Sequence, residues 1–119
     1  MEIFQPDIFP FSIAIGQIND AKEFVDEDHK EIVVNESALG VTIRAYRIDK
    51  ENNKEYPYAL IVFPSKPSVA TIAHEAYHAA TALLENIHVY ASAASEEVFA
   101  YLIGYISDCI DKTVQKIWA

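Results

Sequence analysis

The sequence is poor in cysteine, glycine and basic residues. Cys109 is the single cysteine among 119 residues, so no internal disulfide can form, and a lone thiol is typical of a reducing compartment. With only three glycines the chain cannot be collagen-like, and a hydrophobic content of 51% excludes a wholly disordered one. There is no internal repeat and no low-complexity tract. We therefore expect one domain, residues 1–119, whose core needs no disulfide.

Basic side chains are outnumbered by acidic ones. Nine Lys and Arg stand against 18 Asp and Glu, which gives a formal net charge of −9. Such a chain repels phosphate backbones, so nucleic acid is not an expected partner. No apolar run is long enough to cross a bilayer, and residues 1–7 lack the basic start of a signal peptide. We expect a cytoplasmic protein with neither a nucleic-acid nor a membrane partner.

The first half of the chain has the pattern of strands. Apolar and alternating stretches predict strands at residues 11–18, 41–48 and 56–63, with a short candidate at 31–35. The polar segment 49–55 predicts a hairpin connection between the two strands that flank it. Residues 19–29 begin with a capping residue but contain little to bury, which predicts a weak helix or an exposed loop.

The second half has the pattern of helices. Two prolines and two serines in residues 64–68 end the preceding strand and favour a helix that runs to about residue 87. A second helix is expected from about residue 95 to residue 116. Strands followed by helices predict an α+β fold, with an antiparallel or mixed sheet of three or four strands packed on two long C-terminal helices.

The first of these helices contains the motif H-E-x-x-H at residues 74–78. Side chains four apart lie on one helix face, so the imidazoles of His74 and His78 can bind one tetrahedral metal ion. Glu75 lies about 100° round the helix from His74, which lets its carboxylate reach a metal-bound water. This arrangement suits metal-assisted hydrolysis. The alternative is a solvated polar helix face on which the three side chains happen to be neighbours.

Helical periodicity separates this motif from the expected core. The apolar stripe consists of Val69, Ile72, Ala76, Ala80, Leu83 and Ile87. The opposite stripe consists of Thr71, His74, His78, Thr81 and Glu85. The two histidines are therefore not expected to be core residues.

A catalytic zinc ion bound by two histidines needs a third protein ligand. Glu85 shares the histidine stripe but lies roughly 10 Å along the helix from His78, which is too far for one ion. His88 follows the helix end and is less favoured as a ligand than as an exposed loop residue. The remaining candidates are Glu96 and Glu97 at the start of the second helix.

Of these two glutamates we prefer Glu97 as the ligand. It shares a helix face with Ala100 and Gly104, whose small side chains would let the two helices approach closely around a shared metal. Glu96 points to one side. The alternative is that both acids are favoured there by the helix dipole alone.

Other residues of the second half are weaker candidates for a role in catalysis or in orienting a metal ligand. A tyrosine hydroxyl can donate to a developing oxyanion, and Tyr101, one turn after Glu97, is the best placed. Simple packing is the alternative for all four candidates, namely Tyr77, Tyr90, Tyr101 and Tyr105. Asp108 either orients a ligand histidine or belongs to a polar face. Cys109 falls on the apolar side of its helix and is expected in the core.

The order of these residues resembles the gluzincin class of zinc metallopeptidases, in which H-E-x-x-H is followed by a glutamate on the next helix. The string IAHEAYHAA...SEEVFAYLIGYI is similar to very short phage- and prophage-encoded metallopeptidase-like proteins, and the resemblance covers roughly residues 58–110. It implies a small zincin-like core, a zinc cofactor, and a peptide or protein substrate. His74, His78 and Glu97 would be the zinc ligands and Glu75 the general base.

The same resemblance implies where a substrate lies and how far activity extends. In zincins an edge strand beside the motif helix pairs with extended substrate, and here strand 41–48 or 56–63 would do so; Pro57 favours the latter. Longer gluzincins carry a further His or Tyr for the oxyanion in a larger C-terminal domain, and these 119 residues match no such domain. A catalytically weak or inactive zincin-like binding module is therefore the alternative function.

Overall fold

The computed structural model describes residues 1–6, 9–20 and 39–119. Its elements are β1 (Glu2–Phe4), β2 (Ser12–Gln17), β3 (Val41–Asp49), β4 (Lys54–Phe63), α2 (Val69–Glu85), the 3₁₀ turn η2 (Ala93–Ser95) and α3 (Glu96–Ile117). The three predicted strands that lie in this part of the chain and both predicted helices are confirmed. The candidate strand at 31–35 lies outside the described residues, as does most of the segment 19–29.

The described strands form a mixed sheet in the order β1-β2-β4-β3. β2 pairs with β4 in parallel, whereas the β1–β2 and β3–β4 pairs are antiparallel. This arrangement confirms the predicted α+β fold with a mixed sheet. The sequence did not predict β1, since a strand of three residues is too short to display a period.

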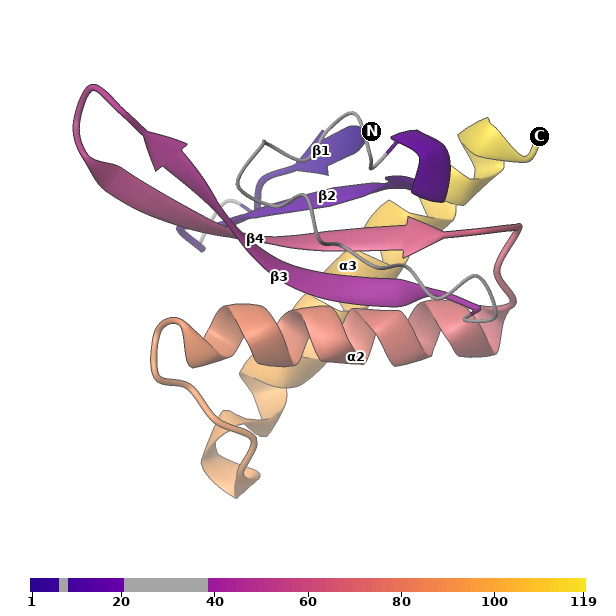
Figure 1. Cartoon of the computed structure of the whole chain (residues 1–119). Helices are drawn as coiled ribbons and strands as arrows, with labels where there is room; N and C mark the ends of the chain where they lie inside the picture. The colour runs from indigo at the N-terminus through magenta and orange to yellow at the C-terminus, as the bar shows by residue number, and fades with distance from the viewer. Residues whose placement is uncertain (7–8, 21–38) are drawn as a thin grey trace.

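The two long helices pack on one face of the sheet. α2 contacts β3, β4 and α3, and α3 contacts β2. Figure 1 shows α2 lying along β3 and α3 crossing obliquely behind it. The side chain of Ser68 caps α2 by accepting a hydrogen bond from the backbone N–H of Thr71 at 3.2 Å, as its position in the sequence predicts. None of the described helices is long and apolar enough to cross a membrane.

The main core lies between this face and the helices. On α3 an apolar stripe is buried at Phe99, Leu102, Ile106 and Ile110. On α2 the expectation holds for Ala76, Ala80 and Leu83 but is wrong for Val69 and Ile87, which are 83% and 39% exposed. Val69 is the first residue of α2 and Ile87 lies two residues after its last residue, so both lie beyond the stretch that packs on the sheet.

β3 is the edge strand of the described sheet on the side of α2, and β4 lies inside the sheet. The preference for strand 56–63 as the edge, which was based on Pro57, is therefore wrong. β2 pairs only with residues 58–63 of β4, so Pro57 lies where β4 extends beyond β2. Its missing N–H consequently removes no bond to β2, and the proline is tolerated.

Replacement of Ile106 by alanine tests the helix–sheet core. Ile106 is fully buried, so we expect Ile106→Ala to lower the free energy of unfolding by about 3 kcal/mol. The same change at the exposed Ile3 should cost less than about 1 kcal/mol. Urea denaturation followed by circular dichroism measures both variants. Equal decreases in the free energy of unfolding for the two variants would contradict the packing described.

Candidate active site

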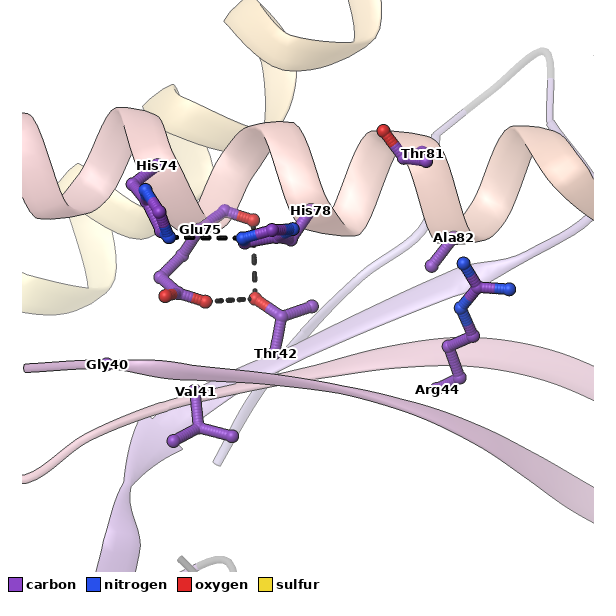
Figure 2. A pocket seen from close by; sticks show the side chains of 9 residues that line it. All are labelled: Gly40, Val41, Thr42, Arg44, His74, Glu75, His78, Thr81 and Ala82. Carbon is purple, nitrogen blue, oxygen red and sulfur yellow. Dashed lines mark hydrogen bonds between the residues drawn. The ribbon is translucent and has the colours of Figure 1, made fainter. Parts of the chain in front are cut away.

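The two motif histidines lie on the exposed surface of α2 with their rings close together (Figure 2). The Nε2 atoms of His74 and His78 are 3.0 Å apart. The ring centroids are 4.6 Å apart, and the rings are nearly perpendicular at 76°. One turn of helix thus directs both Nε2 atoms to a common point, as the four-residue spacing predicts.

Glu75 points from α2 toward β3 and is buried, with 5% of its surface exposed. Its Oε2 atom accepts a hydrogen bond from the hydroxyl of Thr42 at 2.5 Å. The same hydroxyl lies 3.3 Å from the backbone carbonyl oxygen of Glu75. A buried carboxyl group needs such a donor, because desolvation without a partner costs on the order of several kcal/mol. Thr42 therefore fixes the position of the Glu75 carboxyl group.

Gly40 allows α2 to approach β3 closely. A Cβ atom at this position would lie 2.9 Å from Cε1 of Phe63 and 3.1 Å from Cγ of Glu75. Both separations are shorter than an ordinary van der Waals contact, so any larger residue would push the Glu75 side chain or the aromatic ring aside. The absence of a side chain at Gly40 thus contributes directly to the placement of Glu75.

These side chains line a pocket of about 400 Å³ between α2 and β3. Its lining residues are Gly40, Val41, Thr42, Arg44, His74, Glu75, His78, Thr81 and Ala82. Beyond Thr42 the same face of β3 makes two further polar contacts with α2 and its C-cap. Nη1 of Arg44 lies 2.6 Å from Oε2 of Glu85, and the Tyr46 hydroxyl donates to Oδ1 of Asn86 at 3.3 Å.

The histidine pair fits two ligand positions of a zinc ion. Two nitrogens bound to one tetrahedral zinc at about 2.0–2.1 Å are roughly 3.3 Å apart, and the two Nε2 atoms here are 3.0 Å apart. A small rotation of either exposed ring would provide the difference. Imidazole nitrogen is also a ligand that zinc prefers. The donors present therefore match two of the three protein ligands that a catalytic zinc ion needs.

The structure does not bring Glu97 to the histidine pair. Glu97 is exposed in the first turn of α3, and the described residues contain no group of three His, Cys, Asp or Glu side chains that could hold a metal ion. The expectation that Ala100 and Gly104 lie between the helices is wrong, because both are exposed and a Cβ atom on Gly104 would meet nothing within 4 Å. The assignment of Glu97 as third ligand stays a prediction.

The predicted oxyanion donor Tyr101 is exposed on α3 and does not line the pocket. The ring centroid of Tyr77 lies 6.1 Å from that of His78. His88 is exposed in the loop after α2 with a φ of 59°, and Asp108 is exposed on α3.

Cys109 belongs to the core, as its helix position predicts. Burial raises the pKa of its thiol, and a hydrogen bond with Tyr105 opposes this effect only in part. The folded-state pKa is thus shifted away from the thiolate form that a nucleophile requires. Cys109 is therefore a packing residue.

Sequence reasoning missed the contribution of β3 to this site. Thr42, Arg44 and Tyr46 alternate with Val41 and Ile43, and this period of two places the polar members on the face that meets α2. The alternation was visible in the sequence. Its polar face could not be assigned to α2, because nothing in the local pattern shows which helix covers a strand.

Comparison with protein-family models, curated proteins and solved structures finds no match to this chain. The resemblance to the gluzincins therefore stays a prediction based on the motif and its context.

Thr42→Val tests the support of Glu75. Valine keeps the shape of threonine but removes the hydroxyl, which leaves the buried Glu75 carboxyl group without this donor. We expect the free energy of unfolding to fall by about 1–3 kcal/mol. Thr42→Ser keeps a hydroxyl and should lower the free energy of unfolding by a smaller amount. If urea denaturation showed the serine variant to be as unstable as the valine variant, the hydrogen bond would not be the cause.

Proposed function

We propose that this protein is a zinc-dependent hydrolase of peptide bonds, in which His74 and His78 bind zinc and Glu75 is the general base. One observation carries the proposal: two Nε2 atoms 3.0 Å apart border the same pocket as a buried glutamate. This combination supports metal-assisted hydrolysis, because zinc bound there would polarise a scissile carbonyl and activate water. The resemblance to the gluzincins, and not the geometry of the pocket, supports Glu97 as the proposed third ligand. Tyr101 is the proposed oxyanion donor because of its position one turn after Glu97.

Glu75 is suited to moving a proton within the pocket. Its carboxyl group is directed toward β3 and held there by the Thr42 hydroxyl at 2.5 Å, so its position does not depend on the substrate. In the proposed reaction Glu75 takes a proton from the attacking water and passes it to the leaving amine. Thr42 acts through Glu75 and is a positioning residue.

β3 offers a place for an extended peptide beside these groups. It is the edge strand of the described sheet, and it lies next to the motif helix. An edge strand can bind an extended peptide through main-chain hydrogen bonds, as in strand addition. This location supports a peptide or protein as the substrate, with its backbone laid along β3.

The setting of the protein is part of the proposal. A cytoplasmic location is supported by the lone Cys109, which suits a reducing compartment. The net charge of −9 supports a function without a nucleic-acid partner. A phage or prophage origin is supported only by the motif string noted above.

A second candidate function is a zincin-like module that binds protein without cleaving it. The observation that favours it concerns the described residues. No tyrosine among them lines the pocket, and no third His, Cys, Asp or Glu joins the histidine pair in a group that could hold a metal ion. If the protein bound zinc but cleaved no peptide, this result would support the binding module and contradict hydrolysis.

Metal content tests the histidine pair. We expect about one zinc per chain after reconstitution, measured by plasma mass spectrometry. His74→Ala should abolish binding, because one imidazole is lost from the pair. Glu75→Gln should keep the metal and lose hydrolysis of fluorescent casein, since the amide cannot accept the proton.

His88→Ala is the matched control for that measurement. His88 is an exposed loop histidine that does not line the pocket, so its removal should leave zinc content unchanged. An absence of zinc from the reconstituted protein, or equal losses in the His74 and His88 variants, would contradict the metal site.

The third ligand is tested by comparing two neighbouring glutamates. We expect Glu97→Ala to weaken zinc binding roughly tenfold or more, and Glu96→Ala to have little effect. Both residues are exposed in the first turn of α3, so the two changes perturb the helix similarly. Competition with a zinc-chelating dye measures the affinities. A larger effect at Glu96, or none at either, would reject Glu97 as the ligand.

A further inference from the structure

Arg44 lies in the same pocket as the histidine pair and Glu75 (Figure 2). Among the nine described residues that line the pocket, it is the only lysine or arginine. Its side chain projects from β3 toward α2, near Ala82, and 58% of its surface is exposed. A positive group that solvent can reach therefore stands at one end of the proposed active site.

Glu85 orients the guanidinium group without using all of its donors. The ion pair joins Nη1 of Arg44 to Oε2 of Glu85 at 2.6 Å. A guanidinium group has five N–H donors on three nitrogen atoms, and its ion-pair contact with Glu85 is made through one of these atoms, Nη1. Among the described residues no other partner of the guanidinium group is found, so further donors can serve a second acceptor, and carboxylate is the acceptor that matches their planar geometry.

The register of β3 sets the separation between Arg44 and the catalytic groups. Thr42, which holds Glu75, and Arg44 are two residues apart on one face of the strand. A strand rises about 3.3 Å per residue, so their Cα atoms are separated by roughly 7 Å along β3. An extended peptide beside β3 has the same rise. A carboxylate that contacts Arg44 would consequently lie within about two residues of the bond presented to Glu75.

Because the protein as a whole is negatively charged, Arg44 matters for the binding of an acidic substrate group in the pocket. With a net charge of −9, the protein repels acidic peptides at long range. Favourable binding of an acidic group in the pocket must therefore come from short-range contacts, and Arg44 is the lining side chain with a permanent positive charge.

We infer that Arg44 is a specificity-determining residue, which selects substrates carrying a carboxylate within about two residues of the scissile bond. The inference rests on the proposed function, because the scissile bond is defined by His74, His78 and Glu75. The carboxylate belongs either to an acidic side chain or to the C-terminus of the peptide. Both sources offer the same bidentate acceptor to the guanidinium group.

The experiment uses fluorescein-labelled heptapeptides of alanine and leucine. One aspartate or one asparagine is placed at successive positions, and each peptide has a free or an amidated C-terminus. Hydrolysis by the zinc-loaded protein gives kcat/KM for each peptide. Fluorescence anisotropy with the Glu75→Gln variant gives the affinity without cleavage, so binding is measured even if turnover is absent.

We expect one position of aspartate, or the free C-terminus, to be preferred about tenfold over its neutral counterpart. Arg44→Gln should remove the preference, and Arg44→Lys should retain part of it, because lysine keeps the charge but not the planar geometry. Higher salt should weaken the preference.

Lys116→Gln is the matched control. Lys116 is exposed and forms an ion pair with Glu2 at 3.3 Å, so its replacement changes the net charge equally and also breaks a surface ion pair. The preference should survive in this variant. Equal affinity for aspartate and asparagine peptides, no measurable binding of either, or a preference that persists in Arg44→Gln would overturn the inference.

These outcomes are distinct from failure of the proposed function. A protein that binds zinc and cleaves acidic and neutral peptides equally would retain the proposed function and exclude selection by Arg44. A protein that binds acidic peptides through Arg44 but cleaves none would retain the carboxylate site and favour the binding module.

Discussion

The contact between Glu75 and β3 determines how the rest of the candidate site is arranged. A glutamate side chain that is 5% exposed can be accommodated only where a donor meets its carboxyl group, and Thr42 provides that donor. Glu75 belongs to α2, so this hydrogen bond and the buried residues Ala76, Ala80 and Leu83 favour the same rotation of the helix about its axis. His74 and His78 are thereby turned to the exposed side of the helix, with their Nε2 atoms 3.0 Å apart.

The same contact depends on close packing beneath it. Gly40 leaves room for Cγ of Glu75 and for the ring of Phe63, which is itself part of the main core. Farther along, the ion pair of Arg44 with Glu85 joins β3 to the last turn of α2. Exposed ion pairs contribute only about 0–1 kcal/mol, so this pair orients a side chain more than it stabilises the fold. The core beneath the helices supplies the stability on which the site depends.

The proposed function and the selection by Arg44 divide the pocket into two parts. One part contains the histidine pair and Glu75, whose chemistry is that of water activation and proton transfer. The other contains Arg44, whose chemistry is recognition of an anion. The residues of both parts belong to α2 and β3. The distance between Glu75 and the guanidinium group of Arg44 is therefore set by regular secondary structure and not by a loop.

Local patterns in the sequence predicted the fold class well. Strands 41–48 and 56–63 and the buried stripe of α3 were visible because their periods depend only on neighbouring residues. The proximity of the two histidines was predictable for the same reason, since four residues on a helix always bring side chains together. The inward face of α3 was predictable from its apolar stripe. The expectation that Ala100 and Gly104 lie between the helices was wrong, because both residues are exposed.

The sequence by itself determined the H-E-x-x-H pair, its helix and the α+β arrangement, all of which follow from spacing and hydrophobic period. Only the tertiary structure decided that β3 is the edge beside the motif, that Thr42 meets Glu75, and that Arg44 enters the same pocket. These contacts join residues more than 30 positions apart. Their partners are selected by sheet order and helix packing, which no local pattern encodes.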